Sequence, residues 1–585
     1  MENQIVIDEN VKGDCRKWMK QMKNTGYPSI DKPWLKYYSE EALHGEIPKC
    51  TMYEYIFDHN KSHLDGIALR YFTKKITYQK LFENIRKTAD AFWAQGIRKG
   101  DAVTIMSLNT PETIYCIYAL NYIGAVANMV YMTLSEEEIV ETVKNTDSKM
   151  FIFLDVAAEK VRNVVEDIEK IRVLAISPTD SLGFPVQKFS ALKSKINTKE
   201  FWNWKDFLKA GEHQKAQQTS YHENELSVIV YTSGTTGTPK GVMLSNDSLN
   251  AVAWQYEKSG MKFTRGETFL TFMPPFLSIG LSLNVHLPLS LGLVSDMVID
   301  PEPQNVTRMY LKKKTNHFTA APMNIVQVFE QIKGNMQFCI TMAGGGESLR
   351  TEQEAEINEE LRKRHSEAKY LTGYGMTEFS ATVTTSMNHV YKAGTLGIPL
   401  CKVNIKVINP DNGEKLKYNE TGELCFCTPS HMLGYLDNEE ETNQIFDRDS
   451  QNNLWLHTGD LGFVDEDGFV RFVGRMKRIY LAQAADGTLY KIFPQRIEET
   501  ISEYPEVDMC AVVVELDAQN IATAIACVKR TAESQNNNNF LTGLQQYCKE
   551  KLPVHLVPKQ IIELDEIPLT QNGKIDYKTL EKMTR

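Results

Sequence analysis

The stretch from Tyr231 to Gly241 combines the residue types that a polyphosphate ligand needs. It reads Tyr-Thr-Ser-Gly-Thr-Thr-Gly-Thr-Pro-Lys-Gly, so open glycine backbone, several hydroxyls and the ammonium of Lys240 fall close together. It is not the common P-loop, because Pro239 stands five residues after Gly234 and the Gly-Lys-Ser/Thr ending is missing. The stretch predicts a phosphate-binding loop, with a plain surface turn as the alternative.

Three later stretches carry groups that a nucleotide could use. Gly344, Gly345 and Gly346 form a cluster of bare backbone against which a flat ring could lie. Gly373-Tyr-Gly-Met-Thr-Glu378 offers an aromatic face, a hydroxyl and a hard carboxylate that suits Mg²⁺. Leu456-His-Thr-Gly-Asp460 offers a carboxylate that could accept both hydroxyls of a ribose. The first and the last of these stretches, taken alone, are also compatible with ordinary turns.

Together and in this order, the motifs resemble the signatures of the adenylate-forming superfamily: acyl-CoA synthetases, nonribosomal adenylation domains and luciferases. The resemblance is greatest to an AMP-forming acyl-CoA synthetase, a fatty-acid–CoA ligase. It extends over nearly the whole chain after the first fifty residues. It implies ATP, Mg²⁺ and CoA as cofactors, with a phosphopantetheine arm as the alternative acceptor, and a small-molecule carboxylic acid as substrate.

The resemblance also implies a role for each matching residue. The catalytic residues are Lys574, Thr377 and Glu378, and Glu378 is also the metal ligand. Lys574, on an Asn-Gly turn, would bridge the substrate carboxylate and the α-phosphate. Lys477 is the hinge about which a C-terminal domain swings. The nucleotide-binding residues are Thr232, Ser233, Gly234, Thr235, Thr236, Gly237, Lys240, Gly344, Gly345, Gly346, Tyr374, Gly375, Asp460 and Arg475.

The identity of the acceptor stays open. After the hinge the sequence departs from the family pattern, with Gly487 seven residues before Pro494, in a loop that lines the acceptor tunnel of the family. One hypothesis is an acid–CoA ligase. The other is a stand-alone adenylation enzyme that loads an acyl carrier protein, because the Pro-Leu-Thr-x-Asn-Gly-Lys ending resembles that of nonribosomal adenylation domains. A non-catalytic nucleotide-binding protein is disfavoured, since Lys574, Glu378 and Asp460 are all retained.

The acid-binding residues are expected in the segment that matches the gate and pocket of the family. Phe276, Leu277 and Gly280 form the predicted acyl pocket, and the histidine of many acyl and aryl members is absent. No acidic residue occurs between Glu267 and Asp296, which disfavours an amino-acid substrate. An apolar pocket suits a fatty, branched or aromatic acid. The alternative is that these side chains only pack a core.

Helix and strand patterns alternate along the sequence, and we expect these elements to position the motifs. Ala68–Phe72 reads as a strand, and Thr77 is a suitable N-cap for a helix that runs to Gly96. Such alternation is typical of an α/β layered fold. The run from Leu281 to Leu293 alternates with period two, which favours a strand, whereas the resemblance implies a helix beginning near Gly280. We expect the helix.

We therefore expect a multi-domain α/β chain with an additional α+β part. A helical N-terminal extension covers residues 1–50. A large AMP-binding domain covers residues 51–475, with layered α/β subdomains and a distorted β-barrel. A small mobile C-terminal α+β domain covers residues 476–585 and carries Lys574.

The amino-acid composition limits the classes of protein to which the chain can belong. The net charge of −10 argues against general nucleic-acid binding, which needs clustered cations. No charged-then-apolar leader opens the sequence, and no apolar run reaches the roughly 18 residues of a membrane span. Of ten cysteines only Cys425 and Cys427 are close, inside a predicted strand, so we expect reduced thiols instead of zinc ligands. A cytoplasmic enzyme is expected.

Overall fold

The computed structural model describes residues 6–7, 24–168, 171–182, 197–232, 239–345, 351–478, 480–483, 489–517, 521–531, 534, 537–569 and 575–584. Contacts divide the chain into two units, each with a hydrophobic core of its own. Unit 1 comprises Met1–Lys23, Lys32–Asn404 and Phe426–Leu456, and unit 2 comprises Asn24–Asp31, Ile405–Cys425 and His457–Arg585. The expected multi-domain α/β class is confirmed.

Unit 1 contains an eight-stranded sheet in the order β21-β10-β9-β5-β4-β6-β7-β8. Its parallel centre consists of β5 (Val126–Met129), β4 (Ala102–Met106), β6 (Met150–Leu154) and β7 (Arg172–Ile176). Every residue of β4 and β6 is buried, which explains why β6 is entirely apolar and β4 is apolar except for Thr104. β8 (Trp202–Asn203) lies at one edge of the sheet.

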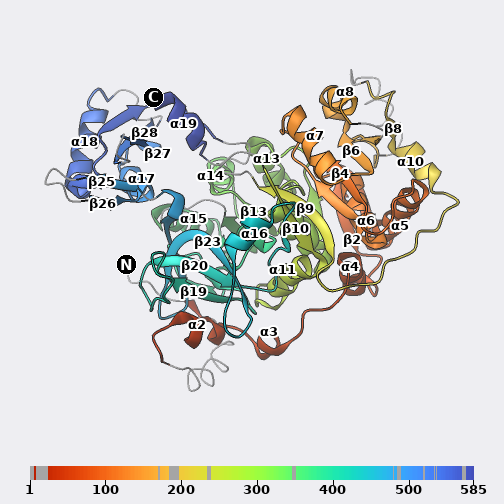
Figure 1. Ribbon diagram of the computed structural model, residues 1–585, viewed down its shortest axis with the longest axis horizontal. Helices are drawn as coiled ribbons and strands as arrows, with labels where there is room; N and C mark the ends of the chain where they lie inside the picture. The colour runs from red at the N-terminus through yellow and green to blue at the C-terminus, as the bar shows by residue number, and fades with distance from the viewer. Residues whose placement is uncertain are drawn as a thin grey trace. The chain divides into compact units, whose positions relative to one another are not determined.

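Helices pack beside this sheet (Figure 1). The helix α5 (Tyr78–Ala94) packs against α6 (Pro111–Ile123), and α7 (Glu136–Asn145) packs against α8 (Ala158–Glu166). Thr77 caps α5 as predicted, because its hydroxyl accepts a hydrogen bond from Lys80 N at 3.2 Å. The helix α10 (Trp204–Ala210) follows β8 and also packs on α5.

A second sheet of unit 1 has nine strands in the order β18-β16-β15-β14-β13-β11-β12-β2-β3. The strands β2 (Ile67–Tyr71), β12 (Val294–Met297), β11 (Thr268–Thr271), β13 (His317–Ala320), β14 (Thr341–Gly345) and β15 (Tyr370–Tyr374) run parallel. Antiparallel β3 (Lys74–Thr77), β16 (Thr384–Thr385) and β18 (Ile398–Pro399) flank them. The helices α13 (Pro303–Lys313), α14 (Pro322–Gln331) and α15 (Thr351–Lys363) connect successive strands.

One carboxylate, Asp296, is buried inside this second sheet. Its Oδ2 lies 3.0 Å from Arg70 Nη2 and its Oδ1 lies 2.9 Å from Lys313 Nζ. Arg70 stands opposite Asp296 on the neighbouring strand β2, and Lys313 is the last residue of α13. Because a buried carboxylate is costly unless it is paired, the two cations fix β12 to β2 and to α13.

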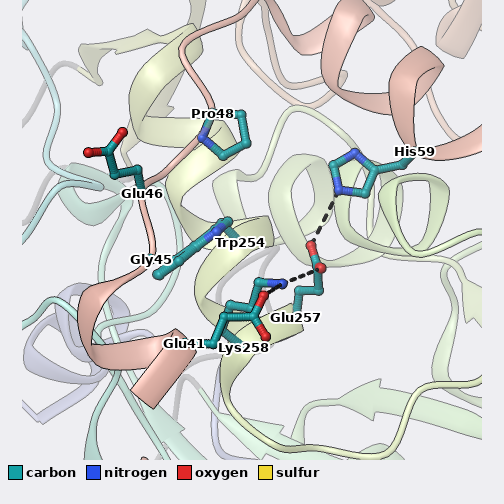
Figure 2. Close-up of a pocket in the computed structure, with 8 residues that line it drawn as sticks. All are labelled: Glu41, Gly45, Glu46, Pro48, His59, Trp254, Glu257 and Lys258. Carbon is teal, nitrogen blue, oxygen red and sulfur yellow. Dashed lines mark hydrogen bonds and ion pairs between the residues drawn. The ribbon is translucent and has the colours of Figure 1, made fainter. Parts of the chain in front are cut away.

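A pocket of about 270 Å³ lies between α3 (Glu40–His44), α4 (Met52–Asn60) and α11 (Asn246–Lys258). Figure 2 shows a chain of charges in it: Lys258 Nζ lies 2.6 Å from Glu41 Oε1 and 3.0 Å from Glu257 Oε1, and His59 Nε2 lies 3.4 Å from Glu257 Oε2. The lining contains none of the residues predicted to bind a nucleotide or an acid. We therefore assign its charged groups a structural role.

The His59–Glu257 pair predicts a pH-dependent contribution to stability. Burial opposes both charges, but hydrogen bonds from His59 and Lys258 prevail and lower the pKa of Glu257 from 4.5 to about 2. For the same reason the hydrogen bonds to Glu257 and the Tyr55 carbonyl raise the pKa of His59 above 6.5. Glu257 therefore stabilises the fold above about pH 4.5, and His59 loses its contribution as the pH rises through its folded pKa.

We expect Glu257→Gln to lower the thermal unfolding midpoint more at about pH 5.5 than at a pH above the folded pKa of His59, where the imidazole is neutral. Scanning calorimetry at both pH values measures the difference. Glu41→Gln is the matched control, because Glu41 pairs with Lys258, whose pKa is raised above 10.5. Equal losses for Glu257→Gln at both pH values would contradict the prediction.

Among its described residues, unit 2 contains two larger sheets and a two-stranded sheet, in which β25 (Tyr480–Gln483) pairs antiparallel with β26 (Leu489–Ile492). In the first, β19 (Asn404–Ile408), β20 (Gly422–Cys427) and β23 (Leu454–Val464) lie side by side, and β24 (Val470–Arg475) pairs with β23. In the second, the order is β27 (Val507–Leu516), β28 (Ala522–Arg530) and β29 (Gln560–Glu563). The helices α17 (Pro494–Ser502), α18 (Phe540–Lys551) and α19 (Tyr577–Thr584) complete this second part, the C-terminal lobe (Figure 1). The closure of a barrel stays a prediction.

Within the described ranges of the chain, no helix has both the length and the apolar character that crossing a membrane requires.

Candidate nucleotide and acid site

Two antiparallel strands hold the ends of the predicted phosphate loop. The strand β9 (Leu226–Thr232) pairs with β10 (Lys240–Ser245), and Thr232 stands opposite Lys240. Tyr231 is fixed at both its side chain and its backbone: its hydroxyl donates to Asn128 Oδ1 at 2.9 Å, and its carbonyl accepts from Tyr131 Oη at 2.7 Å. The apolar run Val228-Ile-Val230, which leads into the predicted loop, lies within β9.

Lys240 belongs to a set of contacts that reaches Glu378. Its ammonium forms an ion pair with Glu441, on α16 (Glu439–Ile445), and lies 5.1 Å from the centroid of the Tyr435 ring. The Tyr435 hydroxyl donates a hydrogen bond to Glu378 Oε1 at 2.7 Å. Burial and then the neighbouring carboxylate raise the pKa of Tyr435, so the phenol keeps its proton. The groups predicted for phosphate and for metal therefore contact the same side chain.

Glu378 lies in the short helix η4 (Thr377–Phe379), just after β15. Its residue is 7% exposed, and its carbonyl accepts from Met432 N at 2.8 Å. The neighbouring Thr377 Oγ1 accepts a hydrogen bond from Ser278 Oγ at 3.4 Å. This contact joins the predicted catalytic turn to the segment predicted to bind the acid.

The glycines predicted for the adenine lie inside a strand and not after one. The strand β14 begins at Thr341 and includes Gly344 and Gly345. A Cβ on Gly344 would lie 1.9 Å from Tyr370 Oη, so this position has no room for a side chain. The bare backbone is thus required by packing as well as by the predicted ligand.

Tyr374 ends β15, the strand beside β14. It is half-buried, and its ring stacks on Phe426 with 5.8 Å between the centroids. A Cβ on the next residue, Gly375, would lie 1.9 Å from Ala381 O. Close backbone packing after Tyr374 therefore fixes where its ring can go.

The predicted acyl-pocket residues pack into the core of unit 1. Phe276 is 8% exposed, and its ring centroid lies 4.9 Å from that of Tyr131. Leu277 is half-buried against the same core. A Cβ on Gly280 would lie 2.0 Å from Pro274 O, which explains the glycine. Their role in binding an acid stays a prediction.

The helix expected near Gly280 is confirmed, and it has an unusual form. The π-helix η3 (Gly280–His286) continues into α12 (Leu287–Ser290). Ser282 Oγ donates to Ser380 O at 2.5 Å, so the π-helix is tied to the turn that follows Glu378. Short π-helical turns occur frequently at functional sites, because they re-aim side chains within a helix.

In unit 2, the two residues predicted for the ribose stand opposite each other. Asp460 on β23 is the register partner of Arg475 on β24, and Arg475 Nε lies 3.3 Å from Asp460 Oδ1. The Asp460 side chain is 5% exposed and that of Arg475 is 58% exposed. The pair presents one buried acceptor and one exposed cation from neighbouring strands.

Glu423 supports the turn that leads to Asp460. Its Oε1 accepts from Gly459 N at 3.0 Å, and its Oε2 lies 2.9 Å from His457 Nδ1. Cys425 Sγ lies 3.5 Å from the same His457 nitrogen, so one candidate ligand atom from each of these three residues falls within 4.8 Å of the others. Spacing along the chain could not reveal this cluster, because His457 comes from another strand.

The predicted hinge lies in the short helix η5 (Met476–Arg478). Arg478 Nη2 lies 2.9 Å from Glu498 Oε1 and 2.9 Å from Val512 O, and its guanidinium stacks 3.9 Å from the Tyr577 ring. These partners belong to the C-terminal lobe. The side chain of Lys477 lies outside the described residues.

The remaining predicted site residues also lie outside the described residues: Ser233, Gly234, Thr235, Thr236, Gly237, Gly346 and Lys574.

Comparisons with known proteins identify the family of the chain. The family described as AMP-binding enzyme matches residues 56–436, and the family described as AMP-binding enzyme C-terminal domain matches residues 496–574. A long-chain-fatty-acid–CoA ligase of Bacillus subtilis (strain 168) is 26% identical over 572 residues, which cover 93% of this chain and 96% of the relative. 4-Coumarate–CoA ligase 4 of Arabidopsis thaliana is 26% identical over 516 residues, which cover 86% of this chain and 85% of the relative.

Among solved structures, ATP-bound MatB from Rhodopseudomonas palustris aligns with a TM-score of 0.78 at 20% identity, over 92% of this chain and 99% of that chain. This likeness shows a shared fold. Since the first family match spans well over half of the sequence, the protein belongs to the AMP-binding enzyme family, as an acyl-CoA synthetase-like member of the adenylate-forming superfamily.

Proposed function

We propose that the protein activates a carboxylic acid with ATP as an acyl-adenylate and then transfers the acyl group to the thiol of CoA. The observation that carries the proposal is the contact of Lys240 and Glu378 with the same residue, Tyr435. A phosphate-binding cation and a metal-binding carboxylate held at one place suit a reaction at a polyphosphate, where positioning and electrostatics dominate catalysis.

In the first step, a carboxylate oxygen attacks the α-phosphorus, and the bond to the oxygen of the leaving pyrophosphate breaks. Lys240 would bind phosphate oxygens, and Lys574 would stabilise the charge shared by the carboxylate and the α-phosphate. Glu378 is a buried hard carboxylate that fits Mg²⁺, which would neutralise phosphate charge when bound.

Strands of each unit hold the residues that we propose for binding adenosine. The backbone of Gly344 and Gly345 and the ring of Tyr374 would take the adenine. Asp460 and Arg475 would take the ribose. In the second step the thiolate of CoA attacks the acyl carbonyl, and AMP leaves with the electron pair of the broken anhydride bond.

We propose an apolar acid as the substrate. Phe276 and Leu277 are apolar, and Ser278 next to them contacts Thr377, so the segment reaches the catalytic turn. The names of the two relatives, a long-chain-fatty-acid ligase and a 4-coumarate ligase, support an acid of this class at the coarse level that 26% identity allows.

The test is acid-dependent pyrophosphate release from ATP across fatty, branched, aryl and amino acids, with and without CoA, with products identified by mass spectrometry. An acyl-CoA product supports the proposal and names the acid. Acyl-adenylate that accumulates and is not consumed by CoA would instead favour a carrier protein as acceptor. No acid-dependent release with any substrate would overturn the proposal.

We also propose three domains along the chain. Residues 1–50 form an N-terminal extension, and residues 51–475 form the AMP-binding domain. Residues 476–585 form a mobile lid. Lys477→Pro is then expected to slow thioester formation more than adenylate formation, because proline restricts the backbone that the second half-reaction must turn. Single-turnover rates of both half-reactions measure the split. Lys549→Ala, on exposed surface of α18, is the control; equal losses of both half-reactions in Lys477→Pro would exclude the hinge.

A further inference from the structure

A short segment from Gly434 to Thr442 contacts both charged groups of the proposed ATP site. Its first part, β21 (Gly434–Tyr435), pairs with β10, the strand that begins at Lys240. Tyr435 N donates to Thr442 Oγ1 at 2.9 Å, and Thr442 Oγ1 donates to Asn438 O at 2.7 Å. The segment is therefore held both to the strand of Lys240 and to the start of α16.

Glu441, on the first turn of α16, supplies the counter-charge of Lys240. The two side chains are only partly exposed, at 24% for Lys240 and 36% for Glu441. The ammonium also lies over the Tyr435 ring, whose hydroxyl is bound to Glu378. Lysine acts on phosphate as a compact point charge, so a phosphate that approaches Lys240 must compete with the Glu441 carboxylate.

We propose that Glu441 is a positioning residue that holds Lys240 over Tyr435 in the nucleotide-free protein and competes with the ATP phosphates for its charge. The inference rests on the proposed function. On ATP binding, the ion pair between Lys240 and Glu441 is exchanged for one between Lys240 and phosphate. The hydrogen bond from Tyr435 to Glu378 need not change in this exchange.

The test is the affinity for Mg²⁺–ATP, measured by titration calorimetry without any acid, so that no reaction follows. Glu441→Gln keeps the size of the side chain and removes its charge. We expect it to bind ATP about two- to fivefold more tightly, the value of a partly exposed ion pair. The gain should shrink as salt is added, because salt screens such pairs.

Two further variants separate this specific effect from a general change in charge. Glu439→Gln removes the same charge from an exposed position on α16, and we expect a clearly smaller gain. In a Lys240→Ala background, Glu441→Gln should give no further gain, because the partner is absent.

The outcomes distinguish this inference from the proposed function. ATP binding by the wild type without a gain in Glu441→Gln would overturn the inference alone. So would an equal gain in Glu439→Gln, or a gain that persists without Lys240. A wild type that binds no ATP would overturn both the proposed function and the inference.

Discussion

Replacing Lys574 by alanine is expected to lower the rate of acyl-adenylate formation by about 10²–10³-fold, the typical loss when one preorganised charge donor is removed. As pyrophosphate leaves, negative charge gathers on the α-phosphate beside the attacking carboxylate, and an ammonium there stabilises the transition state more than the ground state. The flanking chain is anchored: Leu569 pairs with Ile575, and Asp576 N donates to Pro568 O at 2.8 Å.

Pyrophosphate exchange with an acid that the wild type uses well measures this loss. Lys578→Ala is the matched control, because Lys578 is an exposed lysine four positions along, on α19, and its removal should leave the rate unchanged. Binding of Mg²⁺–ATP should be affected far less than the rate. Full activity of Lys574→Ala would show that another group stabilises the transition state.

Replacing Asp296 by asparagine is expected to destabilise unit 1 by about 3–5 kcal/mol, since it removes one partner of a buried ion pair and leaves the other uncompensated. Lys313, whose side chain is 14% exposed, would remain among packed strands without its counter-charge. Because the unfolding entropy scales with size, a loss of this size in a unit as large as unit 1 would lower the thermal unfolding midpoint by about 3–6 °C.

Calorimetry of the intact chain measures the shift. Asp58→Asn is the control, because Asp58 pairs with Lys61 at the surface, with side chains 56% and 59% exposed. Such exposed pairs contribute about 1 kcal/mol or less. Similar shifts for the two variants would show that the contacts of Asp296 with Arg70 and Lys313 contribute no more than a surface pair.

Elements with an unambiguous periodicity could be predicted from the sequence. The strand predicted at 68–72 is β2, and Thr77 caps α5 as its position indicated. The run after Gly280 was ambiguous because its polar residues fall at every second position and are buried. Asn284 Oδ1 accepts from Phe272 N and Met273 N at 3.4 Å, and His286 lies between Tyr118 and Asn250. Polar side chains that make hydrogen bonds in the core therefore produced the same alternating sequence pattern as a strand.

Residues of the candidate site could be predicted from the sequence only where they belong to local motifs. Glu378 and Lys240 stood in such motifs, and both contact Tyr435, while their roles in binding metal and phosphate stay predictions. Glu441 and Ser278 could not be found in this way. An ion pair between residues two hundred positions apart leaves no periodic trace, and one serine hydroxyl among apolar neighbours has no special spacing.

The anchoring of Arg478 would limit how the chain can turn at the predicted hinge. Arg475 is paired with Asp460 on one side, and Arg478 is fixed to Glu498 on the other. Between these anchors lie the φ and ψ angles of Met476 and Lys477, together with ψ of Arg475 and φ of Arg478, and the planar peptide bonds add no further soft rotation. A connection with so few rotatable backbone bonds would allow rotation about a small set of axes and would not allow free movement of the C-terminal lobe. The range of this rotation would then be set by the φ and ψ angles that are free of steric clashes.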